Sequence, residues 1–184
     1  MSRSVVLGIG VILLSAAAVC RAQPTNIVLF IGDGMGCEHV AATGMFANGA
    51  AGTLNFELLP YRTMVSTYNA AGTLTDSAAA GTAIATGYKV NNDVVSLAIP
   101  GDGSERLTLL EMYKAQGKST GLVTTDLMTG ATPAAFGAHE TDRDNTTQIA
   151  GDYLNQTRPN VLLGGGGGGM TVSAAQSAGS TVVQ

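Results

Sequence analysis

The sequence predicts an α/β fold with a mainly parallel sheet, and two observations carry this prediction. The first is a continuous apolar run at residues 26–31 (NIVLFI), which has the length of a strand and no alternating polar positions. Such a run is typical of a strand buried on both faces of a parallel sheet. The second is that strand-like and helix-like segments alternate along most of the chain, as they do when helices connect parallel strands.

The expected elements follow one another from residue 26 to the end of the sequence. Three of the helices stop at a residue that readily closes a helix, namely Gly87, Gly117 and Gly179. In chain order we expect a strand at 26–31, a helix at 38–47, a strand at 62–68, helices at 77–86 and 107–116, a strand at 120–125, a helix at 146–154, a strand at 161–163, a helix at 173–178 and a strand at 181–183. Functional side chains of such sheets gather at the carboxyl ends of the strands, and Asp33 lies at such an end.

A run of six glycines at residues 164–169 could be mistaken for a phosphate-binding loop. It lacks the Lys-Ser or Lys-Thr pair that such a loop requires. We therefore expect this run to be a flexible connector.

Residues 1–22 are expected to form a cleaved signal peptide. Arg3 supplies a positive charge, and the apolar run at residues 5–19 is shorter than the roughly 20 residues that a membrane-spanning helix needs. Ala22 suits the last position before cleavage. An uncleaved membrane anchor and a lipid attached to Cys20 are the weaker alternatives. After cleavage Cys37 would stand alone, so no disulfide is expected within residues 23–184.

Composition argues against nucleic acid as a specific partner. The net charge is −4, and no dense stretch of Lys and Arg occurs. Aromatic residues make up only 5% and Trp is absent, so no platform for stacking bases is indicated. A phosphate ligand remains compatible with this composition, because one well-placed Arg and bound metal ions can attract that anion locally.

Asp33 is the first candidate site residue. It lies in the turn at residues 32–36 (GDGMG), directly after the first expected strand. Its carboxylate would project from the sheet edge among glycines that leave room for ligands, and it would suit Mg²⁺ or Zn²⁺. An ordinary Asp in a glycine-rich turn is the alternative, and for this motif alone it is the commoner case.

Ser77 is the second candidate, because it opens the helix expected at residues 77–86. The free amides and the dipole at a helix start favour negative charge, which suits a serine alkoxide and a bound phosphate. The small residues at positions 78–81 let a tetrahedral anion approach. A plain N-cap serine is the alternative.

Thr132 and Arg143 complete the candidates. The Thr132 hydroxyl could bind a metal, or it could cap the short helix that Pro133 begins. The guanidinium of Arg143 could form two parallel hydrogen bonds to phosphate oxygens, or it could be a solvated surface group.

Three segments together resemble the alkaline phosphatase family: FIGDGMG, TDSAAAGTAIATGYK and ATPAAFGAHETDR, in this order. The resemblance runs from about residue 25 to the end of the sequence. It implies a three-layer αβα sandwich with a central, mainly parallel sheet, in which residues 23–184 are the N-terminal part of one catalytic domain that is incomplete at its C-terminus. It implies a homodimer that hydrolyses small phosphate monoesters through a phosphoserine, using two Zn²⁺ and one Mg²⁺, and releases inorganic phosphate. The expected signal peptide makes this protein secreted or periplasmic. No stable membrane anchor is expected.

The resemblance also implies a role for each matched residue. Ser77 would attack phosphorus and touch one zinc. Asp33 would bridge the second zinc and the magnesium, and Thr132 would be a magnesium ligand. Arg143 would clamp the phosphate. Asp76 would orient Arg143 and offer its backbone N–H to the phosphate.

Two features depart from the family pattern. Gly130 stands where many relatives carry Asp or His beside the magnesium, which puts magnesium affinity and the pH optimum in question. Zinc in this family is held mainly by His and Asp of the C-terminal half, whereas this sequence has only His39 and His139, and neither lies on a zinc-ligand segment. His139 is expected to be a hydrogen-bonded structural residue. Because the sequence also ends inside an expected strand, we expect an inactive fragment.

Two other functions remain as alternatives. A phosphodiesterase or sulfatase of the same superfamily is less favoured, because the Cys- or Ser-x-Pro-x-Arg motif of sulfatases is absent and related phosphodiesterases more often use a Thr nucleophile. A non-catalytic fragment that binds phosphate would agree with the missing metal ligands.

Overall fold

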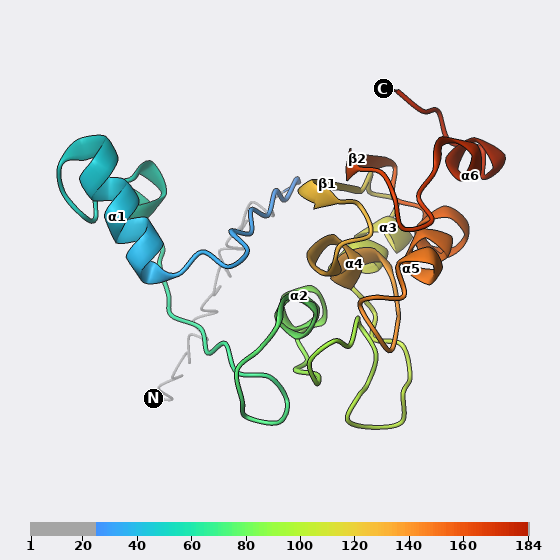
Figure 1. The fold of residues 1–184 in the computed structure, drawn as a ribbon, viewed down its shortest axis with the longest axis horizontal. Helices are drawn as coiled ribbons and strands as arrows, with labels where there is room; N and C mark the ends of the chain where they lie inside the picture. Colours follow the sequence, from blue (N-terminus) through green and yellow to red (C-terminus); the bar gives the residue numbers. More distant parts are fainter. Residues whose placement is uncertain (1–24, 184) are drawn as a thin grey trace, which may run out of the picture. The chain divides into compact units, whose positions relative to one another are not determined.

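The computed structural model describes residues 25–183 and divides into two units, residues 1–31 and residues 32–184. Of the first unit it describes residues 25–31, so the signal peptide expected at residues 1–22 lies outside the described part. The helices and strands of the described residues all belong to the second unit (Figure 1).

The second unit alternates helices with two strands. In chain order these are α1 (Cys37–Asn48), η1 (Asn55–Leu58), α2 (Ser77–Thr86), α3 (Leu109–Ala115), β1 (Gly121–Leu127), α4 (Ala131–Gly137), α5 (Thr146–Asp152), η2 (Tyr153–Thr157), β2 (Val161–Gly165) and α6 (Val172–Ser177). η1 is a short 3-10 helix, and η2 is a π-helical segment that continues α5. The two strands pair in parallel, with Gly121 opposite Val161 and Val123 opposite Leu163.

Helix α2 begins and ends at the predicted residues because both ends carry strong local signals. Its N-cap is Asp76, whose Oδ1 accepts a hydrogen bond of 2.9 Å from the Ala79 amide. Its C-cap is Gly87, which has φ +79° and donates its amide to the Ala83 carbonyl at 3.0 Å. Residue 77 is therefore held at the first position of a well-capped helix.

Three predicted strands are absent from the described residues. Residues 26–31, 62–68 and 181–183 form no ladder, and the side chains of Phe30 and Met64 are both 89% exposed. The prediction of a doubly buried strand at 26–31 is therefore wrong for this structure. An apolar run becomes a strand only when a neighbour supplies ladder hydrogen bonds. Within the described part of the chain, the sheet consists of β1 and β2, which pair with each other.

The main core lies where α2, α4 and α5 meet. Ala78 of α2, Ala134 of α4 and Ile149 of α5 are each 0% exposed, and Tyr153 of η2 packs with them. A second cluster joins Ala79 of α2 to the segment at residues 90–97. The residues that follow Ser77 in α2 thus pack into two clusters, and this packing holds the first turn of the helix in place.

The glycine run at residues 164–169 differs from the flexible connector that was predicted. Gly164 and Gly165 belong to β2, and the backbones of Gly167 and Met170 exchange hydrogen bonds of 3.1 and 2.9 Å. At Gly168, where φ is +52°, an added Cβ would lie 2.7 Å from the Cβ of Thr146. Glycine therefore serves here for a tight turn that packs closely against the start of α5.

Gly81 determines how closely α2 approaches α4. An added Cβ would lie 2.9 Å from the Cβ of Ala135, and both residues are buried. We expect Gly81→Ala to lower the free energy of unfolding by about 1–2 kcal/mol, because overpacking outweighs the gain in helix propensity. Urea denaturation of the chain measures this change.

Gly151 is the matched control, because it also lies inside a helix. An added Cβ there has nothing within 4 Å. Gly151→Ala should therefore stabilise the chain by up to about 1 kcal/mol through helix propensity alone. A stabilising effect of the same size at both positions would contradict the close approach of α2 and α4.

Candidate active site

The predicted site residues gather around the first turn of α2. Asp76 is the N-cap and Ser77 is the first residue of the helix. A helix leaves its first amides without internal partners, so the N–H groups of Ser77 and Ala78 point out of this end. Together with the helix dipole they favour a negative charge in front of Ser77.

Asp33 brings Ser77 and Thr132 together on one side of this turn. Its Oδ1 accepts a hydrogen bond of 3.0 Å from the Ser77 hydroxyl, and its Oδ2 accepts one of 2.7 Å from the Thr132 hydroxyl. Asp33 lies 44 positions from Ser77 and 99 positions from Thr132 in the sequence. The carboxylate is exposed, so a ligand can approach it from solvent.

Asp76 and Arg143 form an ion pair on the other side of the turn. Nη1 of Arg143 donates to Oδ2 of Asp76 at 3.2 Å, and the Asp93 amide donates to the same oxygen at 3.1 Å. The side chains of Arg143 and Asp76 are 33% and 20% exposed. Because Asp76 and Ser77 are consecutive, the guanidinium is held close to the serine.

The carboxylate of Asp76 remains ionised well below neutral pH. Its partial burial acts to raise its pKa, but the amides of Ala79 and Asp93 and the guanidinium of Arg143 outweigh this effect. The pKa of Asp76 therefore lies below its ordinary value. A fixed negative charge thus orients Arg143 throughout the neutral and alkaline range.

Asn92 is a structural partner of the site that the sequence did not reveal. Its Oδ1 accepts the Asp76 amide at 3.1 Å, and its Nδ2 donates to the Leu74 carbonyl at 3.1 Å. The Asp76 N–H, which the resemblance had directed at phosphate, is therefore engaged by Asn92. The sequence of residues 91–93 (NND) is typical of a turn, but nothing in it indicates a partner 16 positions away.

The residues around Asp33 have the chemistry of part of a metal site. Asp33, Ser77 and Thr132 offer one carboxylate and two hydroxyls, which are oxygen donors of the kind that hard cations prefer. Within residues 25–183 no group of three or more His, Cys, Asp or Glu side chains lies close enough to hold a metal ion. These residues fit a share of such a site and do not complete one.

Both histidines are engaged away from these oxygens. Nδ1 of His39 accepts the Gly36 amide at 3.2 Å at the start of α1. The side chain of His139 is 3% exposed and contacts the Ser96 carbonyl and Glu111. The structural role expected for His139 agrees with this environment.

Gly130 is the N-cap of α4, and the space where its side chain would stand is already occupied. An added Cβ would lie 2.9 Å from Oδ2 of Asp126 and 3.0 Å from the Leu127 carbonyl. The carboxylate of Asp126 would therefore have to move before Asp or His could replace this glycine.

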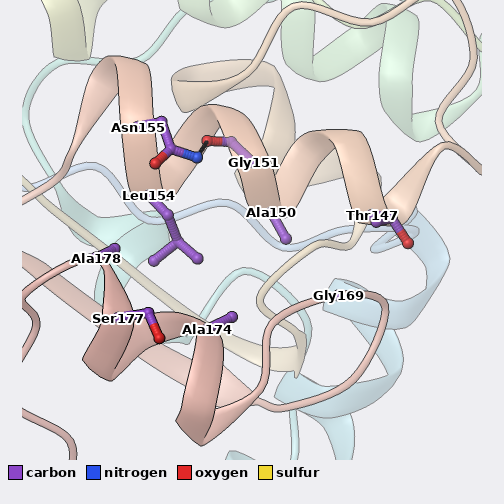
Figure 2. A pocket seen from close by; sticks show the side chains of 9 residues that line it. All are labelled: Thr147, Ala150, Gly151, Leu154, Asn155, Gly169, Ala174, Ser177 and Ala178. Carbon is purple, nitrogen blue, oxygen red and sulfur yellow. Dashed lines mark hydrogen bonds between the residues drawn. The ribbon is translucent and has the colours of Figure 1, made fainter.

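A separate cavity of about 320 Å³ lies between α5, η2 and α6 (Figure 2). Asn155 donates from Nδ2 to the Gly151 carbonyl at 2.9 Å beside it. Its lining residues carry no ionisable side chain; they are Thr147, Ala150, Gly151, Leu154, Asn155, Gly169, Ala174, Ser177 and Ala178. The cavity therefore offers neither a charge for phosphate nor a ligand set for a metal.

The sequence matches a known family and several of its members. A family model described as alkaline phosphatase matches residues 24–180. Alkaline phosphatase 4 of Bacillus subtilis (strain 168) is 39% identical over 166 residues, which cover 82% of this chain and 35% of that protein. Streptomycin-6-phosphate phosphatase of Streptomyces griseus is 36% identical, and the match covers 99% of this chain and 47% of that protein. The chain thus spans between a third and a half of the length of these relatives.

Solved structures show the same likeness. A cold-active alkaline phosphatase from the psychrophile Shewanella sp. matches with a TM-score of 0.66 and 35% identity, over 79% of this chain and 37% of that one. An alkaline phosphatase variant from the Antarctic bacterium TAB5, described with Mg bound in its M3 site, matches with a TM-score of 0.62 and 28% identity, over 73% of this chain and 37% of that one. These likenesses confirm the predicted α/β fold class.

Proposed function

The chain belongs to the alkaline phosphatase family, and we propose that it is the N-terminal part of an enzyme that hydrolyses phosphate monoesters through a phosphoserine at Ser77. One observation carries this proposal. At the start of α2 the Ser77 hydroxyl meets the Asp33 carboxylate, while the preceding residue, Asp76, holds Arg143. The first turn of α2 thus supplies a nucleophile and an anion-binding helix end, and its N-cap holds a cation that can bind phosphate.

Ser77 acts as the nucleophile in this proposal. Its Oγ forms a bond to phosphorus, the bond from phosphorus to the alcohol oxygen breaks, and the alcohol leaves with a proton. Water then attacks the phosphoserine, which releases inorganic phosphate and restores the hydroxyl. The hydrogen bond of 3.0 Å to Asp33 orients Oγ before the attack. The amides of Ser77 and Ala78 stabilise the charge on the transferring group.

Arg143 binds the phosphate. One of its nitrogens, Nη1, is engaged by Asp76 at 3.2 Å, which leaves other N–H donors of the guanidinium for two phosphate oxygens. Asp76 thereby orients the guanidinium, and the backbone link from Arg143 N–H to the Asp93 carbonyl at 2.8 Å fixes its base. The residues assigned here act on the phosphate group and none is assigned to the alcohol, so we expect a broad range of small monoesters as substrates.

Two Zn²⁺ and one Mg²⁺ are the cofactors of this proposal, with Asp33, Ser77 and Thr132 among the ligands. Bound there, the ions would favour the serine alkoxide and neutralise charge on the phosphoryl group. The remaining ligands would come from residues outside this sequence. Two observations support this: the chain has two histidines, both engaged elsewhere, and it spans less than half of the relatives that it matches.

Export and dimerisation belong to the same proposal. Export is supported by the charge and apolar run of residues 1–22, and a homodimer by the family resemblance. Among residues 25–183, no helix combines the length and the apolar character that crossing a membrane requires.

The test compares this chain with the same chain continued into its downstream coding sequence. With Zn²⁺, Mg²⁺ and p-nitrophenyl phosphate, we expect turnover by the longer protein and phosphate on Ser77 after an acid quench, detected by mass spectrometry. We expect little or no turnover by the chain alone. Faster cleavage of a phosphodiester or a sulfate ester than of the monoester would overturn the proposed activity. If the chain alone gave robust turnover that Ser77→Ala abolished, the proposal that the remaining metal ligands lie outside this sequence would be wrong.

A further inference from the structure

His139 lies four positions before Arg143 and is buried between several elements. Its Nδ1 is 2.9 Å from the carbonyl oxygen of Ser96, and its Nε2 is 3.1 Å from Oε1 of Glu111 in α3. Its backbone N–H donates to Oδ2 of Asp152, the last residue of α5, at 2.9 Å. Both ring nitrogens and the backbone N–H of His139 therefore have partners within hydrogen-bonding distance.

Both partners of the ring are acceptors. A carbonyl oxygen only accepts hydrogen bonds, and an ionised carboxylate only accepts them. Oε2 of Glu111 already accepts the Thr108 amide at 2.8 Å, an arrangement that favours the ionised carboxylate. Both ring contacts are then hydrogen bonds only if His139 carries both protons, as an imidazolium.

The charged surroundings favour the same state. Three carboxylates act on this site, from Glu111 in α3, Asp152 in α5 and Glu105 ahead of α3. Burial acts to lower the pKa of His139, but Glu111, the Ser96 carbonyl and the charge of Glu105 together raise it. Burial acts to raise the pKa of Glu111, but the bonds from His139 and Thr108 lower it.

His139 opens the segment at residues 139–145 that carries Arg143, and this segment runs beside residues 92–97. Val95 and Glu140 exchange two backbone hydrogen bonds of 2.9 Å, and the Arg143 amide donates to the Asp93 carbonyl at 2.8 Å. Next to these backbone bonds, the imidazole of His139 contacts the carbonyl oxygen of Ser96. One end of the segment is therefore anchored by His139 in the interior, and the other by Asp76 at the start of α2.

We propose that His139, as an imidazolium paired with Glu111, is a positioning residue for Arg143, because it anchors the segment that presents the guanidinium to the Ser77 turn. That Arg143 binds phosphate rests on the proposed function. The position of Arg143 does not, because the structure itself gives it. The pair is intact when Glu111 is ionised and His139 is protonated. The anchor therefore weakens as the pH rises through the raised pKa of His139, and again as it falls through the lowered pKa of Glu111.

The first test is a pH titration of the ring ¹⁵N signals of the chain by NMR. These signals distinguish an imidazolium from either neutral tautomer, and His39→Gln assigns the two histidines. We expect His139 to be an imidazolium at neutral pH and its titration midpoint to fall in Glu111→Gln. The matched control is Glu38→Gln, which makes the same change at an exposed position of α1 and should leave the midpoint in place.

The second test is amide hydrogen exchange at Arg143. In Glu111→Gln we expect exchange to become faster by about tenfold or more, the loss expected when a hydrogen bond between charged groups is removed. The Gly87 amide, which closes α2, should keep its protection. If this variant does not fold, the wild-type chain serves: Arg143 must lose protection as the pH passes the His139 midpoint, after correction for intrinsic exchange.

Two results would overturn the proposal. One is a His139 ring that is neutral at neutral pH. The other is an Arg143 amide whose protection is indifferent to the protonation of His139. Neither measurement involves phosphate, metal or turnover, so failure of the proposed phosphatase activity would be a separate result.

Discussion

Replacing Ser77 by alanine is expected to lower kcat for p-nitrophenyl phosphate by a factor on the order of 10³ or more in the protein that carries the complete metal site. Alanine removes the oxygen that forms the bond to phosphorus, so no phosphoserine can form. It leaves the Asp76–Arg143 pair in place, since that pair contacts Asp93 and Ala79 rather than the serine hydroxyl. Binding of inorganic phosphate, measured by calorimetry, should therefore be retained.

The control for this substitution is Ser173→Ala, at an exposed position of α6. It removes the same atoms from the chain and should leave kcat and the phosphoserine signal unchanged. Undiminished turnover in Ser77→Ala would contradict the role of Ser77, and so would phosphate trapped on another residue. Loss of phosphate binding together with turnover would show instead that the substitution had damaged the helix start.

Local signals predicted α2 well, because they act within a few residues. Asp76 caps its first turn, and Gly87 takes the left-handed conformation that ends it, so both ends follow from chemistry that is visible in the sequence. The apolar runs at 26–31 and 62–68 carry an equally clear strand pattern. They were predicted wrongly, because a strand also requires a partner, and a sequence pattern does not say whether one is present.

The site was predicted only in part, for a related reason. Local chemistry made Asp33, Ser77 and Thr132 candidates and resemblance to the family selected their roles, and the structure shows that their oxygens meet across 44 and 99 positions of sequence. Asn92 went unnoticed because turn residues are common and its partner is distant in the chain. Residues that only support a site carry no catalytic or ligand group that a sequence motif would reveal, so they are identified from their contacts in the structure.

Asp76 is the residue whose loss should cost the most stability in the site. Asp76→Ala removes the cap on the Ala79 amide, the acceptor of the Asp93 amide and the partner of Arg143. The cap contributes about 1 kcal/mol, and the groups left without a partner about 1–3 kcal/mol more. We therefore expect a loss of about 2–4 kcal/mol in the free energy of unfolding, measured by urea denaturation at neutral pH.

Asp76→Asn separates the cap from the charge. Asn caps helices about as well as Asp, so this variant should keep the bond to the Ala79 amide. Its NH2 group replaces Oδ2, so the variant loses the charged interaction with Arg143 together with the acceptor of the Asp93 amide. Both partners are partly exposed, at 20% and 33%, so that interaction should contribute about 1 kcal/mol. A double-mutant cycle with Arg143→Ala measures it directly.

The pH dependence decides whether the charge of Asp76 matters. A carboxylate whose pKa is lower in the folded than in the unfolded chain contributes stability above its unfolded pKa of about 3.9, and loses it as the pH falls through the folded value. The advantage of wild type over Asp76→Asn should therefore be constant near neutral pH and shrink in acid. If the two proteins differed equally at every pH, the charge would contribute nothing, and Asp76 would hold Arg143 by geometry alone.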